Sequence, residues 1–175
     1  MFTRRGRAAA FVSATAVSAA MLMASPALAD TGAFDDAEGD IADSVDQVRV
    51  VLVNARRVRV TIHHRDLVDR RFTERIWFDT ALRNPGPEFR LEADYPFDLE
   101  LKRVRNWGRP DRTRVPRACN KIAFDYDFEA ETTTYPWPRR CFDANRIRVA
   151  VSVEGKDAPK DWLSGRREFT GWVRR

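Results

Sequence analysis

Residues 47–67 constrain the fold more than any other part of the sequence. Apolar and polar residues alternate through this stretch twice, first as QVRVVLV and then as RVRVTIH. Side chains of an extended chain point alternately to opposite faces, so each run predicts a strand with one buried and one solvated face. Between the runs, Asn54 begins a short polar break, and asparagine tolerates the left-handed conformation that a tight turn needs. The stretch therefore predicts a β-hairpin, with Val48, Val50 and Leu52 on its apolar face.

The same alternation recurs along the rest of the chain. It predicts further strands at residues 76–79, 88–95, 97–102, 122–129, 146–153 and 167–173. Together with the hairpin these make about eight short strands at intervals of about ten residues, a pattern typical of two antiparallel sheets packed face to face. The predicted fold class is all-β, an antiparallel β-sandwich, and an up-and-down β-barrel is the alternative.

The first 29 residues have the composition of a secretory signal peptide. Three arginines precede an apolar, alanine-rich run, and the small residues Ala27 and Ala29 stand where signal peptidase requires them. We therefore expect a secreted, extracellular protein that begins at Asp30 and keeps no membrane span. The Arg4-Arg5 pair leaves both the general secretory route and twin-arginine export open.

Loss of this segment changes the charge of the chain. Removing three arginines from 31 basic residues leaves 28 against 26 acidic ones, so the net charge falls from +5 to +2. The basic residues are nearly all arginine, which in a chain rich in alanine and valine reflects a GC-rich genome. The arginines therefore do not indicate a nucleic-acid partner.

Residues 30–46 contain seven acidic residues and no basic one, which predicts a solvated lead-in with a disordered beginning. A single β-sandwich domain is then expected at residues 47–175. Oxygen ligands in the lead-in are dense enough for Ca²⁺, and Gly39 permits a sharp turn among them. The candidate ligands are Asp36, Glu38, Asp40 and Asp43. Their spacing matches no EF-hand loop, so a solvated acidic segment without an ion is the alternative, and no other cofactor is expected.

The two cysteines of the chain, Cys119 and Cys141, predict a disulfide bond. An even number of cysteines in an exported chain is typical of a disulfide, which would contribute about 3 kcal/mol for a loop of this length. A free catalytic or metal-binding thiol is the less favoured alternative, because neither cysteine has a neighbouring histidine or a CxxC partner.

Two kinds of side chain suggest a ligand-binding surface in the loops. The basic connection at residues 103–117 contains Arg103 and Arg105, which are candidates for binding an anionic polymer. Trp107 and Trp137 stand near glycine and proline, where an aromatic ring can stack on a sugar. The alternatives are a solvated basic loop and tryptophans that close the end of the core.

Common catalytic patterns are missing from the sequence. It has no GxSxG elbow, glycine-rich phosphate loop, HExxH motif or Cys/His cluster. His63 and His64 are interpreted as a polar pair at the end of a strand, with His64 on the buried face. We assign no catalytic residue, although a pair of glycosidase carboxylates stays open because their separation depends on the fold.

The chain resembles a group of uncharacterised small secreted β-rich proteins of actinobacteria. The resemblance rests on Gly39-Asp40, HRDL at residues 64–67, WFD at 77–79, GPEFRL at 86–91, RVAV at 148–151 and the cysteine pair. It implies export and a β-rich domain and transfers no activity. From these features we expect a secreted, non-enzymatic binding module. It would bind cell-envelope polymer, carbohydrate or protein through loops at the ends of the sandwich. A secreted hydrolase with paired carboxylates is the alternative.

Overall fold

The protein is described by a computed structural model. It describes residues 30–40, 45–84, 86–108, 111, 113–156, 159–163 and 165–175. The expected signal peptide at residues 1–29 lies outside the described residues. Within the described ranges, no helix has the length and apolar character needed to cross a membrane.

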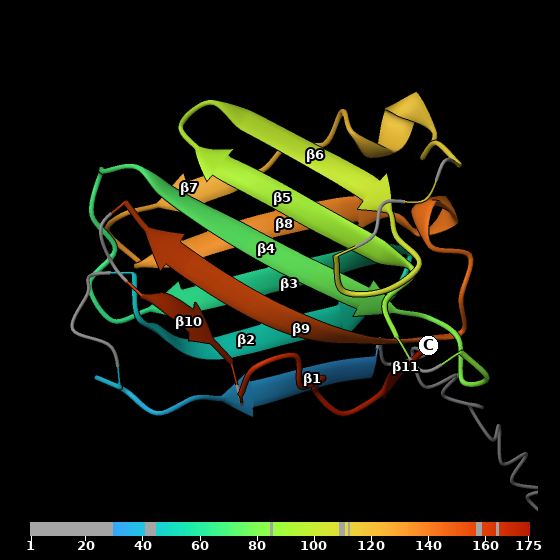
Figure 1. Cartoon of the computed structure of the whole chain (residues 1–175), viewed down its shortest axis with the longest axis horizontal. Coiled ribbons are helices and arrows are strands. Elements are labelled where there is room, and N and C mark those ends of the chain that lie inside the picture. Colours follow the sequence, from blue (N-terminus) through green and yellow to red (C-terminus); the bar gives the residue numbers. More distant parts are fainter. Residues whose placement is uncertain are drawn as a thin grey trace, which may run out of the picture.

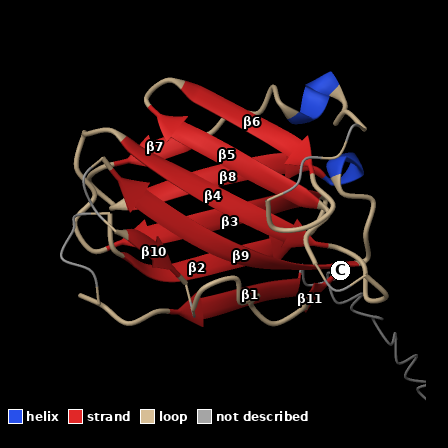
Figure 2. Cartoon of the chain, viewed as in Figure 1, coloured by secondary structure: helices blue, strands red, loops and turns tan. Residues whose placement is uncertain are grey.

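Two antiparallel sheets pack against each other, which confirms the predicted β-sandwich (Figures 1 and 2). The five-stranded sheet has the order β1 (Asp30–Asp35), β2 (Gln47–Asn54), β3 (Arg57–His64), β8 (Thr132–Pro138), β7 (Asp125–Asp127). The second sheet has the order β10 (Lys160–Trp162), β9 (Arg146–Gly155), β4 (Phe72–Asp79), β5 (Phe89–Tyr95), β6 (Asp98–Arg103), with β11 (Val173–Arg174) also paired to β9. Two short 3₁₀ turns, η1 (Arg117–Cys119) and η2 (Arg139–Cys141), lie in the connections.

The predicted hairpin forms β2 and β3, and its apolar face lies in the core. Val50 pairs with Ile62, and Leu52 pairs with Val60, and all four side chains are fully buried. The start of β2 differs from the prediction, because a bulge follows Gln47. The extra residue shifts the alternation there, so Gln47 is buried and Val48 is only half-buried.

Strand β8 was missed by the sequence analysis, which predicted no strand between residues 129 and 146 and interpreted this stretch as a loop that carries Trp137. Prolines lack the N–H that a sheet ladder needs, so Pro136 and Pro138 argued against a strand. In the structure β8 pairs with β3 along its whole length, but β7 pairs only with Thr132–Thr134 of β8. The prolines therefore lie where β8 has one sheet neighbour, and this position tolerates a missing donor.

The acidic lead-in begins with a strand, so the predicted disorder there is wrong. Asp30–Asp35 forms β1 and pairs with β2 over six residues at the edge of the five-stranded sheet. Phe34 packs against the core, and Gly32 lies so close to Val173 that a Cβ there would clash. Backbone pairing and one aromatic anchor thus hold a segment whose composition alone favoured disorder.

The predicted disulfide between Cys119 and Cys141 is confirmed. The two Cα atoms are 5.8 Å apart, and both cysteines are buried. The bond joins η1, in the long connection between β6 and β7, to η2 after β8. It therefore closes a loop that contains β7 and β8.

We expect the Cys119→Ser/Cys141→Ser variant to lose about 3 kcal/mol of unfolding free energy, the chain entropy of a loop of 22 residues. Guanidinium unfolding of the purified protein, with and without a thiol reductant, measures this loss. The reductant should lower the midpoint of the wild type and leave the variant unchanged. Identical midpoints for the wild type in both buffers would contradict the prediction.

Candidate functional site

The candidate site lies on the outer face of the six-stranded sheet. Strand β4 turns Glu74, Ile76 and Phe78 into the core, so Arg75 and Trp77 point outward. The antiparallel register places neighbours beside them: Trp77 lies between Ala150 of β9 and Arg90 of β5, and Arg75 lies between Ser152 and Glu92. These outward residues form the floor of a pocket.

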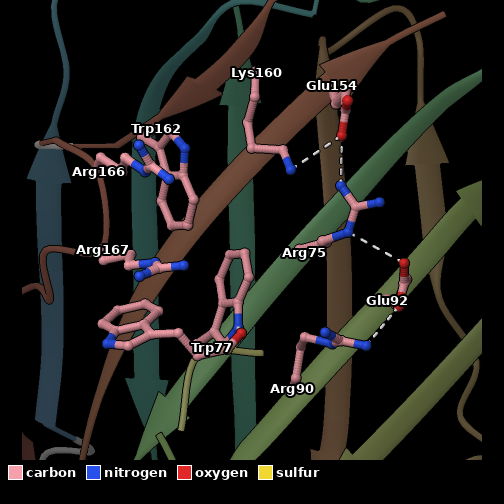
Figure 3. A pocket seen from close by; sticks show the side chains of 10 residues that line it. Arg75, Trp77, Arg90, Glu92, Glu154, Lys160, Trp162, Arg166 and Arg167 are labelled. Atoms are coloured by element: carbon pink, nitrogen blue, oxygen red, sulfur yellow. Dashed lines mark hydrogen bonds and ion pairs between the residues drawn. The ribbon is translucent and has the colours of Figure 1, made fainter. Parts of the chain in front are cut away.

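The pocket has a volume of about 710 Å³ and is walled by β10 and by segments that follow β6 and β10 (Figure 3). Three tryptophans and seven charged side chains line it. They are Arg75, Trp77, Arg90, Glu92, Trp107, Glu154, Lys160, Trp162, Arg166 and Arg167.

One side of the pocket is aromatic. The rings of Trp77 and Trp162 stack, with centroids 4.8 Å apart, and Trp107 packs 5.7 Å from Trp77. The indole N–H of Trp77 donates to the carbonyl oxygen of Trp107 at 3.2 Å, which fixes the loop that carries Trp107. Trp77 itself is buried, whereas Trp107 and Trp162 are partly exposed. Small residues beneath these rings, Ala150 and Ser152, leave room for the stack.

The other side of the pocket is an ion-pair network centred on Arg75. Its guanidinium donates to Glu92 at 3.2 Å and to Glu154 at 2.7 Å. Arg90 pairs with Glu92 at 2.9 Å, and Lys160 pairs with Glu154 at 3.1 Å. Burial alone would raise the pKa of Glu154, but hydrogen bonds from Arg75 and Lys160 outweigh it and lower the pKa. Both partners of the Arg75–Glu154 pair are therefore held in their charged forms.

Two arginines at the rim are not part of this network. Arg166 and Arg167 follow β10, and neither forms an ion pair with another residue in the part of the chain that the structure describes. Arg167 has a φ of 63°, a conformation uncommon for residues other than glycine. The pocket lining holds five cationic side chains against two carboxylates, so it carries a surplus of positive charge.

The four residues predicted to bind a ligand do not form one site. Trp107 lines the pocket, but Arg103 lines a separate hollow beside β6, with its guanidinium 4.8 Å from the centroid of the Phe89 ring. Arg105 is exposed and pairs with Asp111 at 3.8 Å.

The prediction that Trp137 contacts a ligand is wrong. It is fully buried in β8, and its ring packs 5.2 Å from Phe78 and 5.7 Å from Phe142. The alternation of β8 directs Thr133, Tyr135 and Trp137 into the core. No water-exposed ligand can therefore stack on this ring.

Trp77 and Trp162 were missed by the sequence analysis. The signal for Trp77 was present, because it alternates with the inward residues Ile76 and Phe78 and so stands among polar side chains on the outer face of β4. A large aromatic ring on the outer face of a strand can contribute to an apolar patch, and contiguous apolar patches mark binding surfaces. Trp162 gave no such signal, since its strand has only three residues.

A second group of residues gathers where β1 ends. Carboxylate oxygens of Asp36, Asp40 and Asp161 lie within 4.8 Å of one another. Of the other predicted Ca²⁺ ligands, Glu38 is exposed and outside this group, and Asp43 lies outside the described residues. Burial raises the pKa of Asp161 to about 6 despite the N–H donated by Gln47, and repulsion from neighbouring aspartates adds to the rise.

His64 is buried, as its place in the alternation predicted. Its Nε2 lies 3.0 Å from Glu74, whose carboxylate also accepts hydrogen bonds from Thr133, at 2.7 Å, and from Tyr135. The four side chains lie between the two sheets, and none lines a described pocket. This cluster therefore joins the two sheets.

Comparison of the sequence with protein-family models finds no match, and comparison with curated proteins finds none either. The function must therefore be inferred from the chemistry of the pocket and of the acidic group.

We expect Glu74→Ala to lower the unfolding free energy by about 3–5 kcal/mol, because three buried partners lose their acceptor at once. The matched control is Glu100→Ala, which removes a half-exposed carboxylate paired with Lys102 and should cost less than about 1 kcal/mol. Urea unfolding followed by tryptophan fluorescence compares the two variants. Equal losses would show that the buried cluster does not stabilise the sandwich.

The two predicted ligand-binding tryptophans should differ in their contribution to stability. Trp137→Ala removes a fully buried ring and should cost about 3–5 kcal/mol, whereas Trp107→Ala should cost about 1 kcal/mol because its ring is partly exposed. Chemical denaturation measures both, and Trp137→Phe provides a milder variant if the alanine protein does not fold. A Trp107→Ala loss as large as that of Trp137→Phe would contradict this assignment.

Proposed function

We propose that the protein is a secreted, non-enzymatic binding module that binds an acidic glycan in the pocket on the outer face of the six-stranded sheet. The observation that carries the proposal is the combination of partly exposed indole rings with arginines that have no acidic partner among the described residues. The binding surface is thus a sheet face with its flanking loops, and differs from the loop ends that the sequence suggested.

The aromatic side fits the apolar face of a sugar ring. Trp107 and Trp162 each present part of an indole to the pocket, and their positions are fixed by contacts with the buried Trp77. Ligand pockets typically combine such rigid aromatic surfaces with a few polar groups. Because the rings are already packed, binding would cost little side-chain entropy.

The charged side fits a carboxylate or phosphate group on that sugar. The two carboxylates of the pocket are already paired with Arg75, Arg90 and Lys160, so they add little repulsion toward an anion. Arg166 and Arg167 remain to donate, and guanidinium groups bind carboxylates and phosphates through paired hydrogen bonds.

The same geometry favours binding over the alternative of hydrolysis. A glycosidase needs one carboxyl group with a raised pKa to act as the general acid. In this pocket Glu154 has a lowered pKa, and Arg75 holds both Glu92 and Glu154. Neither carboxylate has the environment of a proton donor.

The sequence and the disulfide are consistent with the extracellular location that this proposal includes. The first 29 residues have the features of a signal peptide, and a buried disulfide is typical of proteins in oxidising compartments. Acidic polysaccharides and phosphate-bearing polymers of the cell envelope carry both chemical features that the pocket matches.

We expect the purified protein to bind polygalacturonate more tightly than a neutral glucan, measured by isothermal titration calorimetry. The Arg166→Ala/Arg167→Ala variant should lose at least about tenfold in affinity, since each charge-assisted hydrogen bond contributes about 1.5–3 kcal/mol. Affinity should also fall with added salt. A teichoic acid in a parallel titration distinguishes phosphate-bearing from carboxylate-bearing ligands.

The matched control is Arg103→Ala/Arg105→Ala, which removes the same charge from a surface outside the pocket. It should bind within about twofold of the wild type, because neither arginine lines the pocket and exposed charges are screened by salt. Trp162→Ala should weaken binding to acidic and neutral chains alike. The proposal is overturned if neither acidic polymer binds, or if both double-arginine variants lose affinity equally.

A further inference from the structure

The acidic group near the end of β1 is assembled from segments far apart in the sequence. The chain leaves β1 at Asp35, turns at Gly39, which has a φ of 82°, and carries Asp36 and Asp40 to one place. Asp161 reaches the same place from β10 and accepts the backbone N–H of Gln47 at 2.8 Å. Oxygen ligands of Ca²⁺ lie 2.3–2.6 Å from the ion, so oxygens on opposite sides of it are about 5 Å apart. The carboxylate oxygens of the group lie within 4.8 Å of one another, so one ion could contact all three residues.

A fourth carboxylate, that of Asp46, supplies an independent indication of a cation. Its side chain is fully buried, and Oδ2 accepts the N–H of Gly39 at 2.7 Å and lies 3.4 Å from the Arg65 guanidinium. The other oxygen, Oδ1, is buried and has no hydrogen-bond donor in the described structure. Asp46 lies outside the group of three, but the N–H that it accepts belongs to Gly39, the neighbour of Asp40, and its charge helps to raise the pKa of Asp161. A buried carboxylate oxygen without a donor is costly, and a metal ion is the partner that would satisfy it.

We propose that Asp36, Asp40, Asp46 and Asp161 form a calcium site that joins the end of β1 to β10. Hard carboxylate oxygens select Ca²⁺ or Mg²⁺ over softer metals, and a set assembled from several separate segments suits the variable geometry of Ca²⁺ better than the strict octahedron of Mg²⁺. Sites in extracellular modules typically have dissociation constants of about 10⁻⁴–10⁻³ M. The site adds Asp46 and Asp161 to Asp36 and Asp40 of the predicted ligand set, and it does not use Glu38.

The calcium site would support the glycan pocket through β10. This strand has three residues, and its alternation sends Asp161 to the acidic group and Lys160 and Trp162 to the pocket. A cation bound by Asp161 would relieve the repulsion among the aspartates and fix the strand that carries one wall of the pocket. This coupling depends on the proposed function, whereas the calcium site itself does not.

The calcium site is tested with the metal alone. CaCl₂ is titrated into chelator-treated wild-type protein by calorimetry, and the melting temperature is measured with and without about 10 mM Ca²⁺. We expect a dissociation constant of about 10⁻⁴–10⁻³ M and a rise of several degrees in melting temperature. Mg²⁺ at the same concentration should produce a smaller rise.

Two variants and a control locate the ion. Asp161→Asn and Asp40→Asn should each lose the calcium-dependent rise, and Asp40 is exposed, so its variant tests the site even if Asp161→Asn fails to fold. Asp125→Asn, which removes an exposed carboxylate of β7, should keep the full rise. The site is overturned if the wild type shows neither heat nor a melting shift, or if Asp40→Asn keeps the full rise.

The coupling is tested by measuring polygalacturonate affinity in Ca²⁺ and in chelator. We expect at least about threefold weaker binding in chelator for the wild type and no calcium dependence for Asp40→Asn. Because the polymer itself binds Ca²⁺, a teichoic acid or a monomeric uronate serves as a second ligand. Unchanged affinity in chelator would overturn the coupling and leave the calcium site standing, whereas absent glycan binding in both buffers would overturn the proposed function.

Discussion

The buried carboxylate of Glu74 is the interaction on which the rest of the sandwich depends. It lies between the two sheets and accepts hydrogen bonds from Thr133 and Tyr135, with His64 beside it. A polar group inside a core is costly unless such partners satisfy it, so the cluster favours a packing that keeps β4 opposite β3 and β8. Once Glu74 points inward, the period of two in β4 forces Arg75 and Trp77 to the opposite face. The buried cluster and the pocket floor are thus two consequences of one strand alternation.

The outer face of the sheet is partly covered by the C-terminal segment, and an arginine holds this cover in place. The Arg148 guanidinium donates to the buried Asp79 at 2.6 Å and also lies 4.7 Å and 4.5 Å from the centroids of the Phe169 and Trp172 rings. Phe169 in turn packs 4.8 Å from the ring of Trp107. The segment that carries Arg166 and Arg167 is therefore anchored by the sheet on which the pocket is built. Strands of the same sheet carry the pocket floor and hold the segment at its rim. The pocket is therefore already formed in the protein without a ligand.

Strand β10 contacts both candidate sites, one on each of its faces. It is short and, among the described residues, pairs with β9 alone, so few backbone hydrogen bonds hold it. Side-chain contacts add to this support: Trp162 stacks on Trp77, Lys160 pairs with Glu154, and Asp161 accepts the N–H of Gln47. Because the support of β10 includes charged contacts on both faces, a change in charge at the acidic group would be felt at the pocket, and the proposed coupling rests on this arrangement.

The sequence by itself determined the sandwich class, the central hairpin, most strands and the disulfide. These features follow from local rules: a period of two shows which face of a strand is buried, and two cysteines in a chain can pair only with each other. The same rules failed for β8, where Pro136 and Pro138 are tolerated only because β7 is short, and for β1, whose acidic composition concealed an edge strand. Trp137 was misassigned for the same reason, since its loop was in fact a core strand.

Only the tertiary structure decided which outward-facing residues meet. The pocket takes its tryptophans from three separate segments, at Trp77, Trp107 and Trp162. The acidic group brings Asp161 close to Asp36 and Asp40, although more than one hundred residues separate them in the sequence. The alternation within a strand predicts that a residue faces outward. The order of strands in the sheet decides which side chains of other strands lie next to that residue. That order consists of backbone pairings between segments far apart in the chain, and no short stretch of sequence contains it.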